Sequence, residues 1–471
     1  MSIHGFFSTD TLSKRVVTVG ELPTTKSLYG TFFKMAWPAV IESVLLCLVN
    51  FVDSYMVSTL GINSVAAVGL TTQPRMIFYA VFFAMNISVT AIVSRRKGQG
   101  DRDGANTSLG QALGLNIVLA LVLCGTAIAI AEPLLLFAGA KDDTIVESMQ
   151  YFRITMLGMI FTSFGMVINA AQRGSGNTKI SMRTNIVANC VNILFNYLLI
   201  NGIWFFPELG VRGAAIATVI GNIASFAMSL YSLFVRDGYL RLKLSAVFRW
   251  KASLIATIGR IAFGAGIEQV FMRIGFFLYA KMVADLGTAE FATHTICMNI
   301  INLSFACGDG LSTATSALTG QNLGKKRPDI ATIFGKAGQR IGLCVSLLLV
   351  LLFVFGGGKL VSMFADPADL NYEYVILNGA NIMLIVAVVS PAQISQVIYN
   401  GVLRGAGDTK YVAVTSAISI AIVRPIATYI LSYPLGLGLY GAWLSLLIDQ
   451  YMRLALSFTR FKNGKWSKVI I

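Results

Sequence analysis

The chain has 471 residues, of which 55% are hydrophobic and only 13% are charged, and its formal net charge is +15. Soluble domains carry about 25% charged residues, and a soluble chain this apolar would expose too much hydrophobic surface. The composition therefore excludes an ordinary globular protein and indicates a protein of the lipid bilayer. The positive charge does not require nucleic acid, because basic loops hold the cytoplasmic face of a membrane protein in place.

Residues 1–31 are polar and lack the apolar stretch of a secretory signal, so we expect a cytoplasmic tail there. From residue 32 onward, apolar runs long enough to cross about 30 Å of hydrocarbon follow one another along the chain. Such runs favour helices over the short alternating strands of a membrane barrel. We therefore predict an all-α membrane protein with about twelve spanning helices. Their limits are 32–58, 67–93, 108–131, 147–170, 181–202, 211–235, 256–282, 290–316, 332–356, 372–401, 410–432 and 438–460.

The loops between these helices alternate between cation-rich and cation-poor. Cation-rich loops follow every second span, and the first of them carries Arg95, Arg96, Lys97 and Arg102. The opposite loops hold few cations but include the acids Asp142, Asp143, Glu208 and Asp366. By the positive-inside rule both termini are cytoplasmic, which an even number of spans allows. We expect a multi-pass protein of a bacterial inner membrane.

The two halves of the chain repeat each other. Glu42 matches Glu268, and Leu60-Gly61 matches Leu286-Gly287, both at an offset of 226 residues. Two further matches, at offsets of 231 and 228 residues, pair Arg173-Gly-Ser-Gly-Asn-Thr-Lys179 with Arg404-Gly-Ala-Gly-Asp-Thr-Lys410, and Leu209-Gly-Val-Arg-Gly-Ala214 with Leu437-Gly-Leu-Tyr-Gly-Ala442. These ordered matches indicate a duplicated unit of six spans. Because six is even, we expect two parallel repeats related by a pseudo-two-fold axis along the membrane normal.

This repeat divides the chain into two lobes joined by a linker. We predict an N-terminal tail over residues 1–31, a first lobe over 32–235, a basic cytoplasmic linker over 236–254, a second lobe over 255–460 and a cytoplasmic C-terminal tail over 461–471. A cleft between two such lobes is the expected path of a substrate.

Polar side chains inside the first lobe mark a candidate site. A charge at the centre of a spanning helix costs about 2.5–3.5 kcal/mol, so such residues usually face an interior cavity. Asp53 lies on the first span, Asn192 and Asn196 lie one turn apart on the fifth, and Thr218 lies on the sixth. A carboxylate with amide and hydroxyl oxygens suits a proton, or Na⁺ bound by Asp53, Asn192 and Asn196. The alternative is a hydrogen-bonded cluster that only joins helices.

The second lobe has charged residues of its own. Glu268, like its counterpart Glu42, could bind a cationic substrate or carry a proton, and the alternative is a buried structural hydrogen bond. Arg273 and Lys281 follow Glu268 on the same span, and we expect them to neutralise nearby acids in this lobe.

Three further features of the second lobe have structural interpretations. Asp449 and Arg453 are spaced for pairing along the last span. Arg424-Pro425 predicts an irregularity in the eleventh span. Asp309 and His294 on the eighth span could join a proton relay, although a lone polar residue in a helix is more often structural.

The residues singled out so far resemble the multidrug and toxic compound extrusion (MATE) family over roughly residues 30–460. The positions that carry the resemblance are Pro38, Asp53, Leu60-Gly61, Gly98-Gln-Gly100, Arg173–Lys179, Asn192, Asn196, Leu209–Ala214, Gly320-Gln-Asn-Leu-Gly324 and Arg404–Lys410. It implies two six-helix lobes, rocker-switch alternating access and drug efflux driven by inward flow of H⁺ or Na⁺. It also implies that the first-lobe cation site consists of Asp53, Asn192, Asn196 and Thr218.

The same resemblance assigns roles to other residues. Glu268 corresponds to a glutamate of the family's seventh span, and Pro38 to a first-span proline linked to helix bending. One position departs from the family, because some members carry an aspartate on the tenth span near Gln393. We therefore expect cation coupling to rest on Asp53, and we treat Gln393 and Glu42 as candidates for the substrate cleft.

These observations predict a secondary active antiporter that exports small organic, cationic and amphipathic compounds, including antibiotics, in exchange for H⁺ or Na⁺. We expect no cofactor besides the coupling ion, no nucleic acid, and a monomer surrounded by membrane lipids. One alternative is a flippase of lipid-linked saccharides, in which Arg75, Arg273 and Arg424 would bind pyrophosphate. An enzyme is disfavoured, because the chain has only two histidines and no HExxH, GxSxG or P-loop motif.

Overall fold

The computed structural model describes residues 3–469 apart from 15, 59, 61, 143, 205, 235–237 and 365–371. Gly61 of the repeated Leu-Gly pair, the loop acids Asp143 and Asp366, the start of the predicted linker and the extreme ends of both predicted tails lie outside the described residues.

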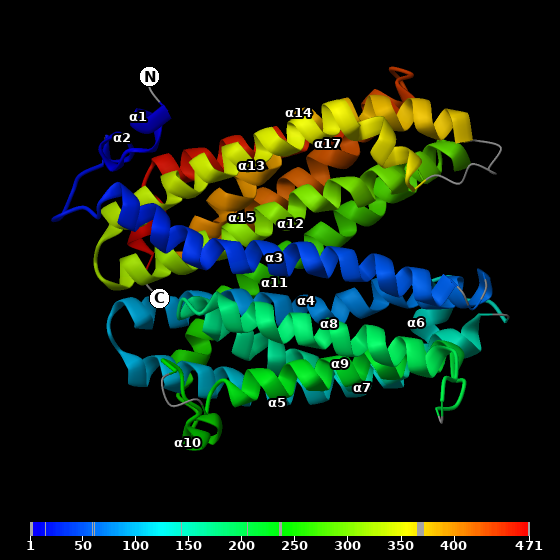
Figure 1. The fold of residues 1–471 in the computed structure, drawn as a ribbon, viewed down its shortest axis with the longest axis horizontal. Helices are drawn as coiled ribbons and strands as arrows, with labels where there is room; N and C mark the ends of the chain where they lie inside the picture. The colour runs from blue at the N-terminus through cyan, green and yellow to red at the C-terminus, as the bar shows by residue number, and fades with distance from the viewer. Residues whose placement is uncertain are drawn as a thin grey trace. The chain divides into compact units, whose positions relative to one another are not determined.

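The described chain is helical and contains no strand, which confirms the all-α class (Figure 1). The helices of spanning length in the first repeat are α3 (Thr25–Ser58), α4 (Ile62–Gly98), α5 (Arg102–Ala129), α7 (Ile145–Gly174), α8 (Thr178–Ile200) and α9 (Gly210–Tyr231). Those in the second repeat are α11 (Ala252–Ala284), α12 (Thr288–Gly324), α13 (Pro328–Ser362), α14 (Tyr372–Gly405), α15 (Thr409–Ile418) continued by η1 (Ser419–Val423) and α16 (Arg424–Ser432), and α17 (Gly438–Lys462). Each predicted span corresponds to one of these segments.

Hydropathy separates these helices into two groups. Among the described residues, nine helical segments are long and apolar enough to cross a bilayer. The remaining three, α8, α12 and α17, have sufficient length but are more polar. Because polar residues are expensive inside a membrane, helices that carry many of them are the first place to look for function.

Short helices occupy segments that the sequence pattern predicts as tails and loops. They are α1 (Ile3–Phe7), α2 (Thr9–Ser13), α6 (Ala131–Phe137), α10 (Leu244–Phe248) and the 3₁₀ turn η2 (Lys465–Lys468). The N-terminal pair packs on unit 1, since Lys336 Nζ donates to the carbonyl oxygens of Leu12 (2.8 Å) and Lys14 (3.0 Å). The predicted tail is therefore a structured element with its own docking site.

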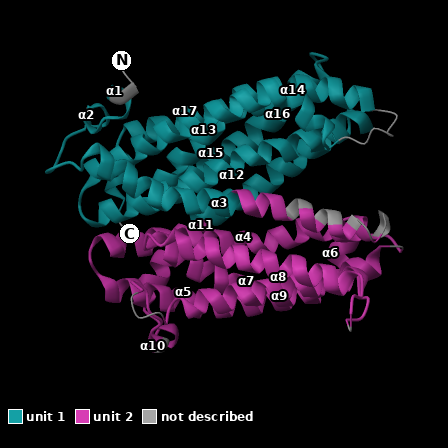
Figure 2. Cartoon of the chain, in the orientation of Figure 1, with its two compact units in different colours: residues 1–43, 264–471 teal, residues 44–263 magenta. Residues whose placement is uncertain are grey.

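The chain forms two compact units (Figure 2). Unit 1 consists of residues 1–43 and 264–471, and unit 2 of residues 44–263. The division cuts α3 and α11, so the first part of each helix belongs to a different unit from the rest. As a result, α3 is a continuous helix that carries Pro38 and Glu42 in unit 1 and Asp53 in unit 2.

Glycines let the site-bearing helices approach closely within each unit. In unit 2, a Cβ atom on Gly221 of α9 would lie 2.7 Å from the carbonyl oxygen of Ala188 on α8. In unit 1, a Cβ atom on Gly401 of α14 would lie 2.6 Å from the carbonyl oxygen of Ser312 on α12. Both distances are too short for any larger residue, so glycine sets the spacing of these helix pairs.

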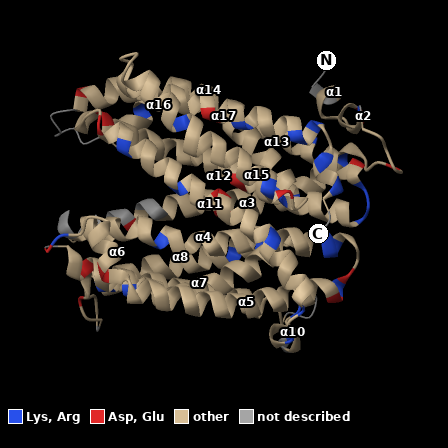
Figure 3. Ribbon diagram, turned by 180° about the vertical axis from the view of Figure 1, so that it is seen from behind, with Lys and Arg blue, Asp and Glu red and all other residues tan. Residues whose placement is uncertain are grey.

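The irregularity predicted at Arg424-Pro425 is confirmed. Five residues before it, Ser419–Val423, form a π-helical turn between α15 and α16. Proline lacks the amide hydrogen that would continue the regular ladder, and π turns are frequent at functional positions. Figure 3 shows charged residues at the helix ends and also along spanning helices.

Candidate functional site

The predicted first-lobe residues come together in unit 2. Asn196 Nδ2 donates to Asp53 Oδ1 at 2.9 Å, and it also approaches Asn192 Oδ1 at 3.3 Å. Asn192 Nδ2 in turn approaches Thr218 Oγ1 at 3.3 Å. The i,i+4 spacing of the two asparagines on α8 points both amides the same way, so one helix face supplies both.

The amide of Asn192 has a second orientation that satisfies its surroundings better. Turned over, its Nδ2 donates to Asp53 Oδ1 at 2.8 Å, and its Oδ1 accepts from the backbone amide of Thr218 at 3.2 Å. Thr218 Oγ1 meanwhile donates to the carbonyl oxygen of Ala214 at 3.0 Å. In this arrangement Asp53 receives two neutral N–H donors, which stabilise its ionised form.

The side chains of the Asp53 cluster are largely removed from solvent. Asn192 and Asn196 are 6% and 2% exposed, whereas Asp53 is half-buried. Among the described residues, Asn196 Oδ1 has no hydrogen-bond partner. A buried acceptor beside a carboxylate is suited to a proton or cation, because either would supply the missing positive partner.

Arg75 on α4 is a residue of this site that the sequence pattern does not assign to it. It lies within electrostatic range of Asp53, and its guanidinium carbon lies 5.0 Å from the centre of the Tyr151 ring. No ion pair joins it to Asp53 among the described residues. The sequence does show Arg75 as a charged residue within the second predicted span. It does not indicate which acid lies near that arginine.

Neutral partners limit what Asp53 can bind. No group of three or more His, Cys, Asp or Glu side chains suited to a metal occurs in the described part of the chain. One carboxylate with amide and hydroxyl groups matches a singly charged cation better than a divalent metal, which prefers several charged ligands. The residues present therefore fit either predicted coupling ion, H⁺ or Na⁺.

The acids of unit 1 are held differently. Glu268 is 2% exposed, and its Oε1 accepts from Arg404 Nη2 at 2.5 Å and from Ser416 Oγ at 3.3 Å. Arg404 lies in the last turn of α14 and belongs to the repeated Arg-Gly-Ala-Gly motif. Arg404 is therefore the ion-pair partner of Glu268, and the expectation that Arg273 and Lys281 neutralise acids of this lobe stays a prediction.

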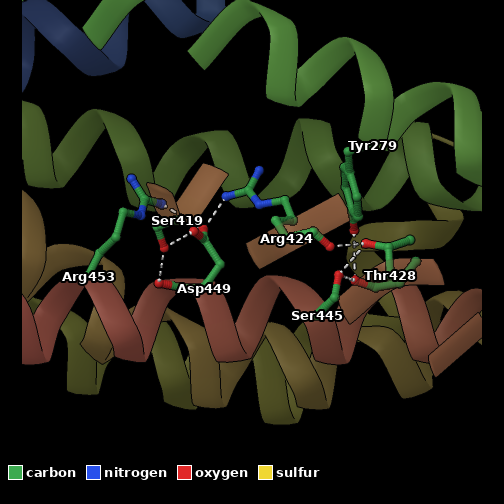
Figure 4. Close-up of polar contacts among 8 residues, drawn as sticks. Tyr279, Ser419, Arg424, Thr428, Ser445, Asp449 and Arg453 are labelled. Atoms are coloured by element: carbon green, nitrogen blue, oxygen red, sulfur yellow. Dashed lines mark hydrogen bonds and ion pairs between the residues drawn. The ribbon is translucent and has the colours of Figure 1, made fainter. Parts of the chain in front are cut away.

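A second ion network lies at the π-helical turn (Figure 4). The predicted pair forms, with Arg453 Nη2 at 3.0 Å from Asp449 Oδ2, and Arg424 Nη2 binds the same oxygen. Ser419 Oγ donates to Asp449 Oδ1 at 2.5 Å. Asp449 and Arg424 are both fully buried. This network carries two positive charges and one negative charge.

Aromatic side chains surround the buried guanidinium of Arg424. Its central carbon lies 5.1 Å from the ring centre of Phe276 and 5.5 Å from that of Tyr279, which suits cation–π attraction. Further along, the hydroxyl groups of Thr428 and Ser445 lie 2.6 Å apart (Figure 4). Arg424, one of the three arginines that a flippase would use for pyrophosphate, is thus already bound to protein groups.

The remaining predicted residues lie in unit 1. Pro38 and Glu42 are buried on α3, and Gln393 is fully buried on α14. Neither amide atom of Gln393 has a partner among the described residues. His294 is 5% exposed and packs between the rings of Tyr279 and Trp443, at 5.2 and 5.5 Å. Their predicted roles in the cleft and relay stay predictions.

A duplicated helical bundle, with one acid held by neutral groups and others held by arginines, defines a multi-pass membrane protein of the transporter class. The family model MatE matches residues 38–198 and 265–430, one segment in each repeat. The chain therefore belongs to the MatE family.

Curated relatives extend this likeness over nearly the whole chain. "Probable multidrug resistance protein NorM" of Thermotoga maritima is 26% identical, over 97% of this chain and 96% of its own. "Multidrug resistance protein PmpM" of Pseudomonas aeruginosa is 29% identical, over 80% of this chain and 78% of its own.

Solved structures show the same fold. The structure described as the outward-facing conformation of a multidrug resistance MATE family transporter of the MOP superfamily superposes with a TM-score of 0.86. It is 21% identical and covers 92% of this chain and 96% of its own. A MOP superfamily transporter from Pyrococcus furiosus, whose title reports reverse polarity of its binding pocket, has a TM-score of 0.87 at 22% identity, covering 94% of this chain and 97% of its own.

Proposed function

We propose that this protein is a secondary active antiporter that exports organic cations from a bacterial cell in exchange for an inward-moving ion. The observation that carries the proposal is the Asp53 cluster, where a carboxylate within the bilayer is held by neutral amides. Intramembrane acids of this kind are costly and mark ion pathways. The names of the bacterial relatives support drugs as the substrate class.

The geometry favours H⁺ over Na⁺ as the coupling ion. The groups closest to Asp53 are N–H donors, whereas Na⁺ needs several oxygen ligands. A proton on Asp53 needs only one acceptor, and Asn196 Oδ1 becomes that acceptor when its amide turns over. The driving force is about 1.4 kcal/mol per pH unit plus about 2.3 kcal/mol per 100 mV of membrane potential.

Continuity of α3 supplies the link from ion to substrate. Protonation of Asp53 neutralises the carboxylate to which the amides of Asn192 and Asn196 donate hydrogen bonds. The packing of this end of α3 in unit 2 then changes. The other part of α3, with buried Pro38 and Glu42, packs in unit 1. A bend at Pro38 would let the two parts of the helix move separately during rocker-switch alternating access.

Topology and assembly follow from the same features. Cation-rich loops at alternate positions support cytoplasmic termini in the bacterial inner membrane. Both repeats occur in one chain, so we propose that a single copy is the working unit. We disfavour the flippase, because Arg424 is bound to Asp449 and Arg75 lies beside Asp53.

Transport in proteoliposomes with independently imposed pH and Na⁺ gradients tests this function. We expect a pH gradient to drive uphill movement of ethidium without Na⁺. The isosteric variant Asp53→Asn should fold normally yet transport no faster than empty liposomes, because it cannot exchange a proton. Drug resistance at the wild-type level in cells that carry Asp53→Asn would contradict the assignment. A strict requirement for Na⁺ would retain the antiporter but replace its ion.

A further inference from the structure

One face of α12, a helix of unit 1, carries polar side chains over residues 295–316, interrupted by Ala306. Positions that recur every three or four residues share a helix face. On this face they are Thr295, Asn299, Asn302, Ala306, Asp309, Thr313 and Ser316, which we call the polar stripe. Thr295, Asn302 and Asp309 are exposed, Asn299, Thr313 and Ser316 are partly exposed, and Ala306 is buried.

The position of Asp309 shows which medium this stripe meets. Asp309 lies 15 residues before the end of α12 at Gly324, or about 22 Å at 1.5 Å per residue. That depth is near the middle of a spanning helix. An exposed carboxylate there cannot face hydrocarbon without a cost of several kcal/mol, so the polar stripe faces water.

Within the described part of the chain, Asp309 is an acid of unit 1 that is not paired with a guanidinium. Its carboxylate lies within electrostatic range of Arg404 and Glu268, which already neutralise each other. Among the described residues, Asp309 makes no hydrogen bond or ion pair. Because Arg404 is already paired with Glu268, the exposed carboxylate of Asp309 has no ion pair of its own among these residues.

The matching helix of the other repeat shows that the fold does not require this polarity. Helix α4 has the same length as α12, 37 residues, and aligns with it at the repeat offset of 226. The residues that match Asn302, Asp309 and Thr313 are apolar: Met76, Phe83 and Ile87. All three are partly exposed, so these accessible positions of α4 are apolar, although Gln73, which matches Asn299, is polar there too.

We propose that the polar stripe of α12 binds the exported compound, with Asp309 holding its cationic centre and Asn302, about 10 Å along the same face, accepting a hydrogen bond from one of its N–H groups. The inference rests on the proposed export function and names its substrate class as organic cations that also carry hydrogen-bond donors. The exposed carboxylate at mid-membrane supplies charge complementarity, and the amide oxygen of Asn302 supplies directionality.

Binding to purified protein in detergent separates charge from hydrogen bonding. The two probes are ethidium, a permanent cation with amino groups, and tetraphenylphosphonium, a permanent cation without N–H donors. Asp309→Asn should weaken both probes about tenfold or more, because each loses its counter-charge. Asn302→Leu should weaken ethidium several-fold and leave tetraphenylphosphonium unchanged.

Two matched variants control for folding and for charge. Glu290→Gln removes an acid from the first turn of the same helix, away from the polar stripe, and should leave both affinities unchanged. Asp309→Glu keeps the charge and should bind both probes within about threefold of wild type. Unchanged binding in Asp309→Asn would overturn the substrate site while leaving ion-coupled export standing. A wild-type protein that binds neither probe would overturn both.

Discussion

Acids inside the two units of this protein are stabilised in opposite ways. In unit 2, Asp53 meets the neutral amides of Asn192 and Asn196. In unit 1, Glu268 is paired with Arg404, and Asp449 is paired with Arg424 and Arg453. A free cation must displace a guanidinium to reach Glu268 or Asp449, whereas Asp53 keeps a charge that a proton can cancel. These acids therefore differ in role: Asp53 is suited to ion exchange, whereas Glu268 and Asp449 have fixed internal counter-charges.

Removal of the central carboxylate of unit 1 should have the largest effect on folding. Asp449→Ala leaves Arg424, which is fully buried, and Arg453 without their counter-charge. Breaking a buried pair in this way costs about 3–5 kcal/mol. We expect little folded protein, measured as monodisperse yield and apparent melting temperature in detergent.

A surface acid provides the matched control for that experiment. Asp103 binds Lys243 at 2.7 Å, but its side chain is 84% exposed. Exposed pairs contribute little, so Asp103→Ala should leave yield and melting temperature unchanged. Equal yields from the two alanine variants would show that the network of unit 1 is not structurally required.

Removal of the Arg404 guanidinium that pairs with Glu268 should have an intermediate effect on thermal stability. Arg404→Gln leaves a carboxylate that is 2% exposed and keeps only the hydroxyl of Ser416. A neutral carboxyl is cheaper to bury than an ionised one, so acid should stabilise the variant relative to wild type. Melting temperatures at pH 5.5 and pH 8 test this, and we expect a rise of a few degrees on acidification in Arg404→Gln alone.

The matched variant Arg404→Lys keeps the positive charge and should retain the wild-type response to pH, at some cost in geometry. If Arg404→Gln and wild type respond identically to pH, the guanidinium is not the counter-charge of Glu268, and the proposed contrast between the two units fails.

Local patterns in the sequence predict the spanning helices. They also group the polar residues of the Asp53 site in unit 2. The last span, predicted at 438–460, is the helix Gly438–Lys462. Asp53 and Asn196 could be grouped because bilayer-length spans place mid-helix polar residues at one depth. Their hydrogen bond is seen in the structure, and their coupling role stays a prediction.

Contacts that depend on long side chains or on docking were not predictable. Arg404 belongs to a motif that looks like a basic loop, yet its guanidinium reaches Glu268, which lies on another helix. Helices α1 and α2 are too short to form alone, and their stability comes from contacts such as that of Lys336 with the carbonyl of Leu12. In both contacts the two residues are far apart in the sequence, so the periodicity of the sequence does not indicate that they meet.

The smallest effect is expected at Thr218, and it decides which ion unit 2 exchanges. Thr218→Val keeps the shape of the side chain but removes a hydroxyl that donates to Ala214 and approaches Asn192. A proton bound to Asp53 does not need this oxygen, so pH-driven ethidium transport should stay within about twofold of wild type. Na⁺ would lose a ligand, and its apparent affinity would fall. Transport by Thr218→Val that recovers only at high Na⁺ would show that the neutral groups around Asp53 bind a metal ion, and would reverse the preference for H⁺ drawn from their N–H donors.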